Sequence, residues 1–145
     1  MSRAVIYETY GGPEVLEVRE VPEPHAEPGE VRVRVRVLGL NPMDGAFSSR
    51  PEMAAQFGLT VPSGFGYDFA GVIDEAGSGT VGFSVGDRVY GGAMARAAAD
   101  FVVVKTPADA LWRTPRRHQR QGGEHPSGSR PHCRRRPCRG RPAVR

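Results

Sequence analysis

Seven residues, Val31 to Val37, alternate valine with arginine without a break. Successive side chains of a β-strand point to opposite faces, so this pattern places four valines on one face and Arg32, Arg34 and Arg36 on the other. The segment therefore predicts a half-buried strand. The three arginines could form a stripe that binds a polyanion, but six glutamates between Glu14 and Glu30 offer partners. We therefore interpret them as a solvated, charge-paired face.

Other apolar or alternating runs lie between glycine and proline residues, which punctuate chains of short strands. The runs that predict strands are Arg3–Glu8, Val15–Val21, Phe65–Ala76, Val85–Tyr90 and Phe101–Val104. Ser49 and Glu52 have the spacing of a capping box with Pro51 in the first turn, which predicts a short helix ending at Gly58. This combination predicts a mainly β fold, a partly open β-barrel with short helices.

Charge and apolar content change sharply after Trp112. Residues 1–112 carry nine Lys and Arg against fifteen Asp and Glu, a net charge of −6, whereas residues 113–145 carry eleven Arg against Glu124 alone, a net charge of +10. Only four of the last 33 residues are apolar. Such a segment cannot bury enough surface to offset the entropy of ordering it. We expect a folded domain over residues 1–112 and a disordered tail over residues 113–145.

The composition of this tail has two interpretations. It contains arginine without any lysine, together with proline, glycine and histidine, as G/C-rich codons give when they are read in a shifted frame. Alternatively, it is a basic arm that binds nucleic acid by releasing counterions from phosphates. We favour the first interpretation, because the tail has no aromatic residue that could stack on a base.

No apolar run approaches the roughly 18 to 20 residues that cross a bilayer, and no secretory signal is visible, so we expect a cytoplasmic protein without a membrane partner. Residues 1–112 contain no cysteine and only one histidine, His25, so we expect no metal site there. The remaining histidines and both cysteines lie in the tail at spacings unlike those of zinc sites: His118, His125, His132, Cys133 and Cys138.

The segment Gly77–Gly82 (GSGTVG) satisfies the dinucleotide-binding pattern G-x-G-x-x-G. That fingerprint requires a helix directly afterwards, because the helix N-terminus holds the pyrophosphate. The following residues, 83–89, read instead as a turn and a strand. We therefore interpret Gly77–Gly82 as a turn between strands.

Four motifs occur in order: YETYGGPEVL at residues 7–16, VLGLNPMD at 37–44, GYDFAGVI at 66–73 and GDRVY at 86–90. Together they resemble the zinc-independent quinone oxidoreductase branch of the medium-chain dehydrogenase/reductase superfamily. The resemblance covers residues 3–112 and implies the GroES-like N-terminal domain of such enzymes. Asn41 and the pair Tyr67-Asp68 stand where zinc-dependent relatives carry a cysteine and a His-Glu pair, which agrees with the absence of metal ligands.

The resemblance also implies a site. The loop Asn41-Pro42-Met43-Asp44 would line the cleft where nicotinamide and substrate meet, with Asn41 and Asp44 as catalytic residues. Asn41, Pro42, Asp44 and Tyr67 would contact the cofactor. Alternatively, Asn41-Pro42 is a turn, Asp44 caps a short helix, and Tyr67 belongs to the barrel core.

The implied chemistry is metal-free hydride transfer from NADPH to a quinone or enone. Relatives continue into a Rossmann domain, of which residues 113–145 show nothing. We therefore expect weak NADPH binding, no activity of the chain alone, and self-association through the apolar face left exposed. A non-catalytic partner subunit and a basic-tailed nucleic-acid-binding module are the alternatives.

Overall fold

The computed structural model describes residues 1–107 and 109–115. The predicted disorder of the tail, its possible nucleic-acid role and its cysteine and histidine residues lie outside the described residues, apart from the first three positions. Those three belong to the folded part: Arg113 is the last residue of a strand, and the Thr114 N–H donates to the Arg88 carbonyl at 2.8 Å. The fold therefore continues slightly past Trp112.

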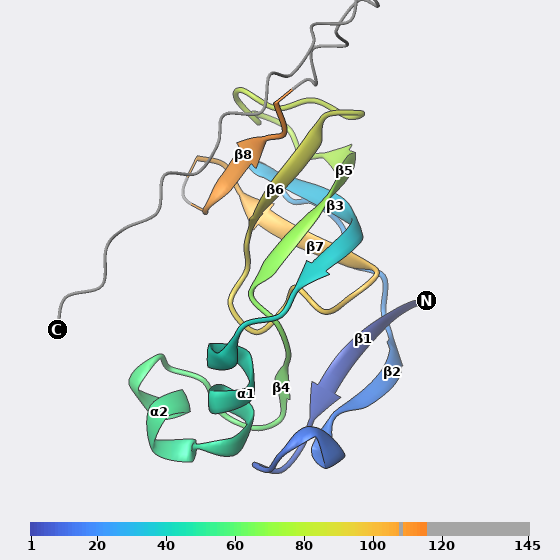
Figure 1. The fold of residues 1–145 in the computed structure, drawn as a ribbon. Coiled ribbons are helices and arrows are strands. Elements are labelled where there is room, and N and C mark those ends of the chain that lie inside the picture. Colours follow the sequence, from blue (N-terminus) through green and yellow to red (C-terminus); the bar gives the residue numbers. More distant parts are fainter. Residues whose placement is uncertain (108, 116–145) are drawn as a thin grey trace, which may run out of the picture. The chain divides into compact units, whose positions relative to one another are not determined.

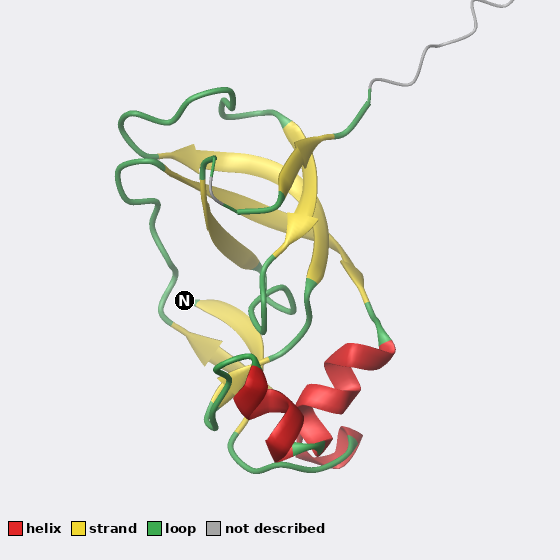
Figure 2. Ribbon diagram, turned by 90° about the vertical axis from the view of Figure 1, so that its left-hand side faces the viewer, coloured by secondary structure: helices red, strands yellow, loops and turns green. Residues whose placement is uncertain are grey.

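Eight strands and two short helices make up the described chain (Figures 1 and 2). In order they are β1 (Ser2–Tyr7), β2 (Glu17–Val21), β3 (Glu30–Gly39), α1 (Pro42–Ser49), α2 (Pro51–Gln56), β4 (Ser63–Gly64), β5 (Asp68–Ala76), β6 (Arg88–Gly92), β7 (Phe101–Lys105) and β8 (Leu111–Arg113), with a 3₁₀ turn at Pro13–Val15 before β2. The prediction of a mainly β fold with short helices is confirmed.

The strands form two antiparallel sheets, one with the order β2-β1-β4 and one with the order β7-β3-β5-β6-β8. The smaller sheet lies with α1 and α2 at one end of the larger sheet (Figure 1). The two sheets do not close on each other, as a partly open barrel requires. Valines and other apolar side chains of the larger sheet form the core: Val31, Val33, Phe69, Ile73, Val89, Val102, Val104 and Leu111, with Ala93 and Ala97.

The valine face of β3 is interrupted. Val31 and Val33 are fully buried, but Val37 is 61% exposed, so the expectation of four valines on one buried face is wrong. The pairing of β3 with β5 shifts register between Val35 and Val37, which leaves Arg36 as an extra residue. A bulge of one residue reverses the alternation beyond it.

The arginine face also departs from expectation, because Arg32 is buried and not solvated. Its guanidinium donates to Asp74 Oδ1 at 2.9 Å, to Glu23 Oε1 at 3.0 Å and to the Pro24 carbonyl at 2.9 Å. Glu75 lies within ion-pair distance at 3.0 Å. Only Glu23 belongs to the six glutamates proposed as partners. The other two carboxylates lie on β5, which the sequence did not pair with β3.

The helical region begins earlier than the capping-box pattern predicted. Ser49 is the last residue of α1, and the N-cap of α2 is Arg50, so the predicted N-cap at Ser49 is wrong. The end of the segment agrees with expectation: α2 stops at Gln56 and Gly58 follows with a φ of +70°. A positive φ is the conformation in which glycine ends helices without strain.

Candidate functional site

The predicted loop residues Asn41, Pro42 and Asp44 lie together at the start of α1. Asn41 is the N-cap and Pro42 the first helical residue. The Asn41 backbone N–H donates to Asp44 Oδ2 at 2.8 Å, and the Asp44 N–H donates to the Asn41 carbonyl at 3.0 Å. Asp44 is only 3% exposed. The carboxylate of Asp44 thus caps the helix, the role that the alternative reading gave it.

The Asn41 side chain joins this loop to β5. Its Nδ2 donates to Asp68 Oδ2 at 2.9 Å. Gly39 makes the approach possible: it pairs with Asp68 across β3 and β5, and a Cβ on Gly39 would lie 2.8 Å from the Asp68 Cβ. Asp68 was absent from the predicted site residues. The signal that could have found it is its place beside Tyr67 in the GYDFAGVI motif.

Tyr67 is half-buried and packs against the end of β6. Its ring lies on Gly92, where an added Cβ would come 2.5 Å from Tyr67 Cζ. Its carbonyl accepts from the Ala93 N–H at 2.8 Å. The structure therefore brings Asn41, Pro42, Asp44 and Asp68 into one hydrogen-bonded group, and Tyr67 reaches that group through the backbone of Asp68.

Two carboxylates thus flank Asn41. Asp44 is buried and Asp68 is exposed. Neither lies within ion-pair distance of a Lys, Arg or His in the part of the chain that the structure describes. A cationic group or a hydrogen-bond donor is therefore electrostatically favoured beside Asp68, and an anion is disfavoured.

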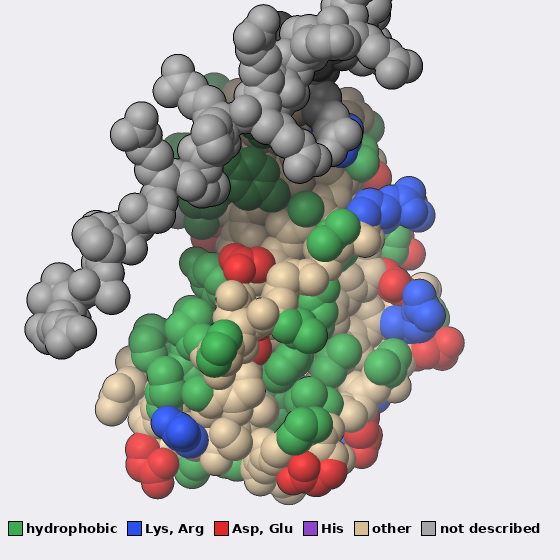
Figure 3. All heavy atoms as spheres, in the orientation of Figure 1, with side chains coloured by type: hydrophobic (Ala, Val, Ile, Leu, Met, Phe, Trp, Pro, Cys, Tyr) green, Lys and Arg blue, Asp and Glu red, His purple; other side chains and the backbone are tan. Residues whose placement is uncertain are grey.

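Large apolar side chains are exposed on the surface of the domain, and Figure 3 shows hydrophobic side chains gathered on the face that carries the helices. Leu40 precedes the site loop and is 69% exposed, and Phe57 follows α2 at 51%. On the larger sheet, Tyr90 and Trp112 stack with ring centroids 5.8 Å apart and remain 44% and 53% exposed. Exposed apolar groups of this size favour association.

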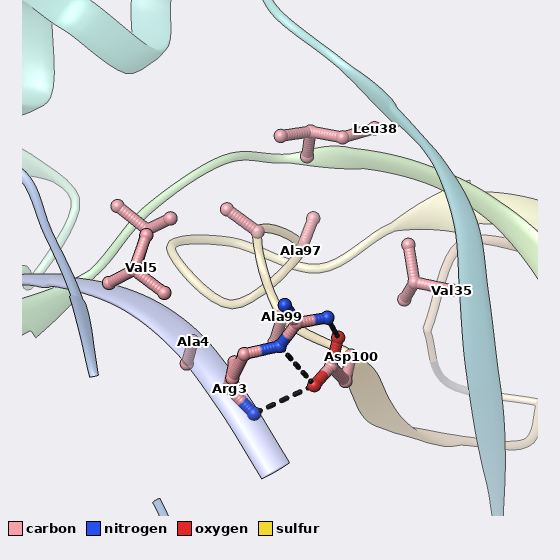
Figure 4. Close-up of a pocket in the computed structure, with 10 residues that line it drawn as sticks. Arg3, Ala4, Val5, Val35, Leu38, Ala97, Ala99 and Asp100 are labelled. Atoms are coloured by element: carbon pink, nitrogen blue, oxygen red, sulfur yellow. Dashed lines mark hydrogen bonds and ion pairs between the residues drawn. The ribbon is translucent and has the colours of Figure 1, made fainter. Parts of the chain in front are cut away.

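A separate pocket of about 290 Å³ lies between β1, β3 and the segment 97–100 (Figure 4). Val5, Val35 and Leu38 supply apolar walls, and Arg3 closes one side by donating to both carboxylate oxygens of Asp100 at 3.1 and 3.0 Å. These hydrogen bonds from Arg3 lower the pKa of Asp100. None of the predicted site residues lines this pocket.

The described residues contain no group of three or more His, Cys, Asp or Glu side chains that could hold a metal ion. They also contain no helix long and apolar enough to cross a membrane. The Gly77–Gly82 segment connects β5 to β6 as a loop, with Gly79 and Gly82 at positive φ, and a strand follows it. Its interpretation as a turn is confirmed. Among the described residues, the Gly77–Gly82 segment is not followed by the helix that a pyrophosphate-binding turn requires.

Comparisons of the chain with known families and with known sequences point to related groups of proteins. Residues 27–116 match the alcohol dehydrogenase GroES-like domain family. A quinone oxidoreductase of Pseudomonas aeruginosa is 44% identical over 89 residues, which are 61% of this chain and 26% of the relative.

Two solved structures share the fold. The human synaptic vesicle membrane protein VAT-1 homolog-like protein superposes with a TM-score of 0.71 at 25% identity, over 80% of this chain and 36% of that one. The Escherichia coli quinone oxidoreductase, solved in complex with NADPH, gives a TM-score of 0.68 at 26% identity, over 78% of this chain and 33% of that one. The chain therefore spans about a quarter to a third of the length of the proteins it matches.

Proposed function

The chain belongs to the alcohol dehydrogenase GroES-like domain family, in the quinone-oxidoreductase-like branch of the medium-chain dehydrogenases/reductases, and we propose that it forms the substrate-side half of an NADPH-dependent oxidoreductase. The acceptor is a quinone or an activated C=C or C=O compound, and no metal takes part. The observation that carries this proposal is the hydrogen-bonded group of Asn41, Asp44 and Asp68, which lies within the part of the chain shared with quinone oxidoreductases.

In this function each loop residue has a distinct task. NADPH, when bound, supplies the hydride. Asp44 fixes the start of α1, so that Asn41 stays at the end of β3. Asn41 and Pro42 face the nicotinamide, and Tyr67, directly before β5, borders the same cleft. The protein's contribution is to orient the two reactants, because a metal-free hydride transfer needs no nucleophile or acid-base pair from this domain.

The domain is incomplete for catalysis by itself in this proposal. We propose a division of the chain into a GroES-like domain over residues 1–112, whose last strand continues to Arg113, and a tail up to residue 145. In this proposal the GroES-like domain does not supply the contacts to the adenosine and pyrophosphate of the cofactor. Binding energy from those remote parts of the cofactor normally holds the reactive ring in place. NADPH fluorescence titration of the chain should therefore show no saturable binding below about millimolar concentration. A micromolar dissociation constant would contradict this expectation.

The activity itself is tested in a chimera. The matched 89-residue region of the P. aeruginosa relative is replaced by its counterpart from this chain, and NADPH-dependent quinone reduction is measured. We expect activity within about tenfold of the relative, and a further loss of about tenfold or more for the variant Asn41→Ala. Gln56→Ala, which removes an exposed amide from α2, is the matched control and should change nothing. A folded chimera that binds NADPH but reduces no quinone would refute the proposal.

The exposed apolar side chains around Leu40, Phe57 and the Tyr90–Trp112 pair support a further part of the proposal, self-association of the isolated chain. Sedimentation velocity over a range of concentrations tests it. A monomer at all concentrations up to about millimolar would count against an interaction driven by these residues.

A further inference from the structure

Asp68 is the one group of the site that combines exposure with a fixed position. Its Oδ2 accepts from Asn41 Nδ2 at 2.9 Å, and its backbone is held opposite Gly39 in the antiparallel pairing of β3 and β5. Because Gly39 has no Cβ, the Asp68 side chain lies directly against β3. The carboxylate is therefore positioned from two sides and still open to solvent.

The charge of this carboxylate is uncompensated within the described residues. Among the described residues, no arginine, lysine or histidine lies within ion-pair distance of Asp68, and its side-chain hydrogen bond is to the neutral amide of Asn41. Asp44, on the other side of Asn41, adds a second carboxylate in the same neighbourhood. An unneutralised negative charge favours a ligand that is, or becomes, positive.

Of the two reactants in the proposed reaction, one gains positive charge. When the C4–H bond of a dihydronicotinamide breaks with its electron pair, the hydride joins the acceptor, a proton from solvent completes the reduced product, and the ring is left as a pyridinium cation. A carboxylate beside the ring stabilises this charge as it develops, so it acts on the transition state more than on the reduced cofactor.

We propose that Asp68, held by Asn41, is a specificity-determining residue. The hydride donor binds at this edge of the site, where the Asp68 carboxylate favours the cationic nicotinamide ring over the neutral one. The inference rests on the proposed function, because it takes the nicotinamide to be the group that Asn41 meets. It assigns the acceptor, on which negative charge develops, to a position away from Asp68.

The sequence offers a direct probe, because Asn41 is the only asparagine of the chain. In the full chain labelled with ¹⁵N-asparagine, NMR shows one backbone amide and one side-chain amide, both from Asn41. Three rings of nearly equal size are titrated: 1-methylnicotinamide, a cation; nicotinamide, which is neutral; and nicotinate, an anion. We expect the cation to shift the side-chain signals with a dissociation constant about three- to fivefold below that of nicotinamide, and nicotinate to bind most weakly, as one charge at about 6 Å from a partly solvated carboxylate would give.

Variants separate the local effect from the overall charge. Asp68→Gln keeps an amide oxygen that can accept from Asn41, adds no second asparagine to the labelled spectrum and removes the charge, so the two nicotinamides should then bind equally. Glu52→Gln removes the same charge from an exposed position on α2 and should leave the preference intact. The eleven arginines of residues 113–145 repel cations in every variant alike, so they cannot produce the expected preference.

The possible outcomes distinguish a failure of the inference about Asp68 from a failure of the proposed function. If both nicotinamides shift Asn41 with equal affinity in the unmodified chain, or if the preference survives in Asp68→Gln, the inference about Asp68 is overturned while the proposed function stands. If neither ring affects Asn41 at about 50 mM, a concentration that detects even very weak complexes, the nicotinamide does not meet Asn41 and the proposed function fails with it. A preference for nicotinate would reverse the assignment of the two sides.

Discussion

Replacing Arg32 should test most directly how much a buried ion pair contributes to the stability of the fold. Its side chain is 11% exposed, and it is hydrogen-bonded to Asp74 and Glu23, ion-paired with Glu75, and placed over the Phe101 ring at 4.7 Å. Replacing it with methionine keeps much of the volume but leaves Asp74, whose side chain is 18% exposed, without its closest charge partner. Breaking a buried ion pair from one side costs about 3–5 kcal/mol.

The expected cost of Arg32→Met is somewhat below this range, because Glu23 and Glu75 are about a third exposed and can regain water. We expect Arg32→Met to lower the free energy of unfolding by about 2–3 kcal/mol, which for a domain of this size lowers the melting temperature by about 10 °C. Urea unfolding followed by the fluorescence of Trp112, the only tryptophan, measures it.

Two comparisons make this prediction refutable. Arg34→Met removes a half-exposed arginine that has one ion pair, with Asp74 at 3.3 Å, and lies over the Phe101 ring at 5.0 Å, and it should cost less than about 1 kcal/mol. Asp74→Asn should destabilise the native sequence but stabilise the Arg32→Met variant, because there it removes a largely buried charge whose remaining partner is the half-exposed Arg34 at 3.3 Å. Equal losses in the two arginine variants, or the same sign for Asp74→Asn in both backgrounds, would show that Arg32 is not the buried partner of Asp74.

Further predictions concern tight packing and pH. Gly71→Ala places a Cβ against the Arg34 carbonyl and should lower the free energy of unfolding in urea by about 1–3 kcal/mol. Gly45→Ala, which has open space around it in α1, should raise it by about 0.5–1 kcal/mol. If both variants lower the free energy of unfolding, the contact with the Arg34 carbonyl does not explain the effect of Gly71→Ala. Since Arg3 lowers the pKa of Asp100, that pair stabilises the fold above the pKa that Asp100 has in the unfolded chain, and the contribution disappears as the pH falls through the lowered value. The stability difference between the native sequence and Asp100→Asn should therefore be constant near neutral pH and vanish at strongly acidic pH; a difference that grows on acidification would contradict the assignment.

The fold was predictable where local pattern and tertiary contact agree. Val31 and Val33 of β3 and the buried apolar residues of β5 and β7 lie where alternation places them, because their partners bury the same face. Prediction failed where pairing itself changes the pattern: the irregular register at Val35–Val37 turns Val37 outward, and no feature of the sequence marks which strand will lie opposite. The burial of Arg32 was missed for the same reason, since its main partners on β5 become neighbours only through the sheet.

The sequence predicted which loop carries the site, but not the hydrogen bond that joins this loop to β5. The motif around Asn41 identified the segment, and the spacing of Asn41, Pro42 and Asp44 is already that of a helix N-terminus. What the sequence did not contain is the bond from Asn41 to Asp68, which spans 27 residues and depends on Gly39. That bond changes the chemistry that the loop can support. A free Asn41 amide would offer a donor and an acceptor to either reactant. An amide whose N–H is used by Asp68 lies beside a negative charge, so we expect this edge to discriminate between a reactant that becomes positive and one that becomes negative.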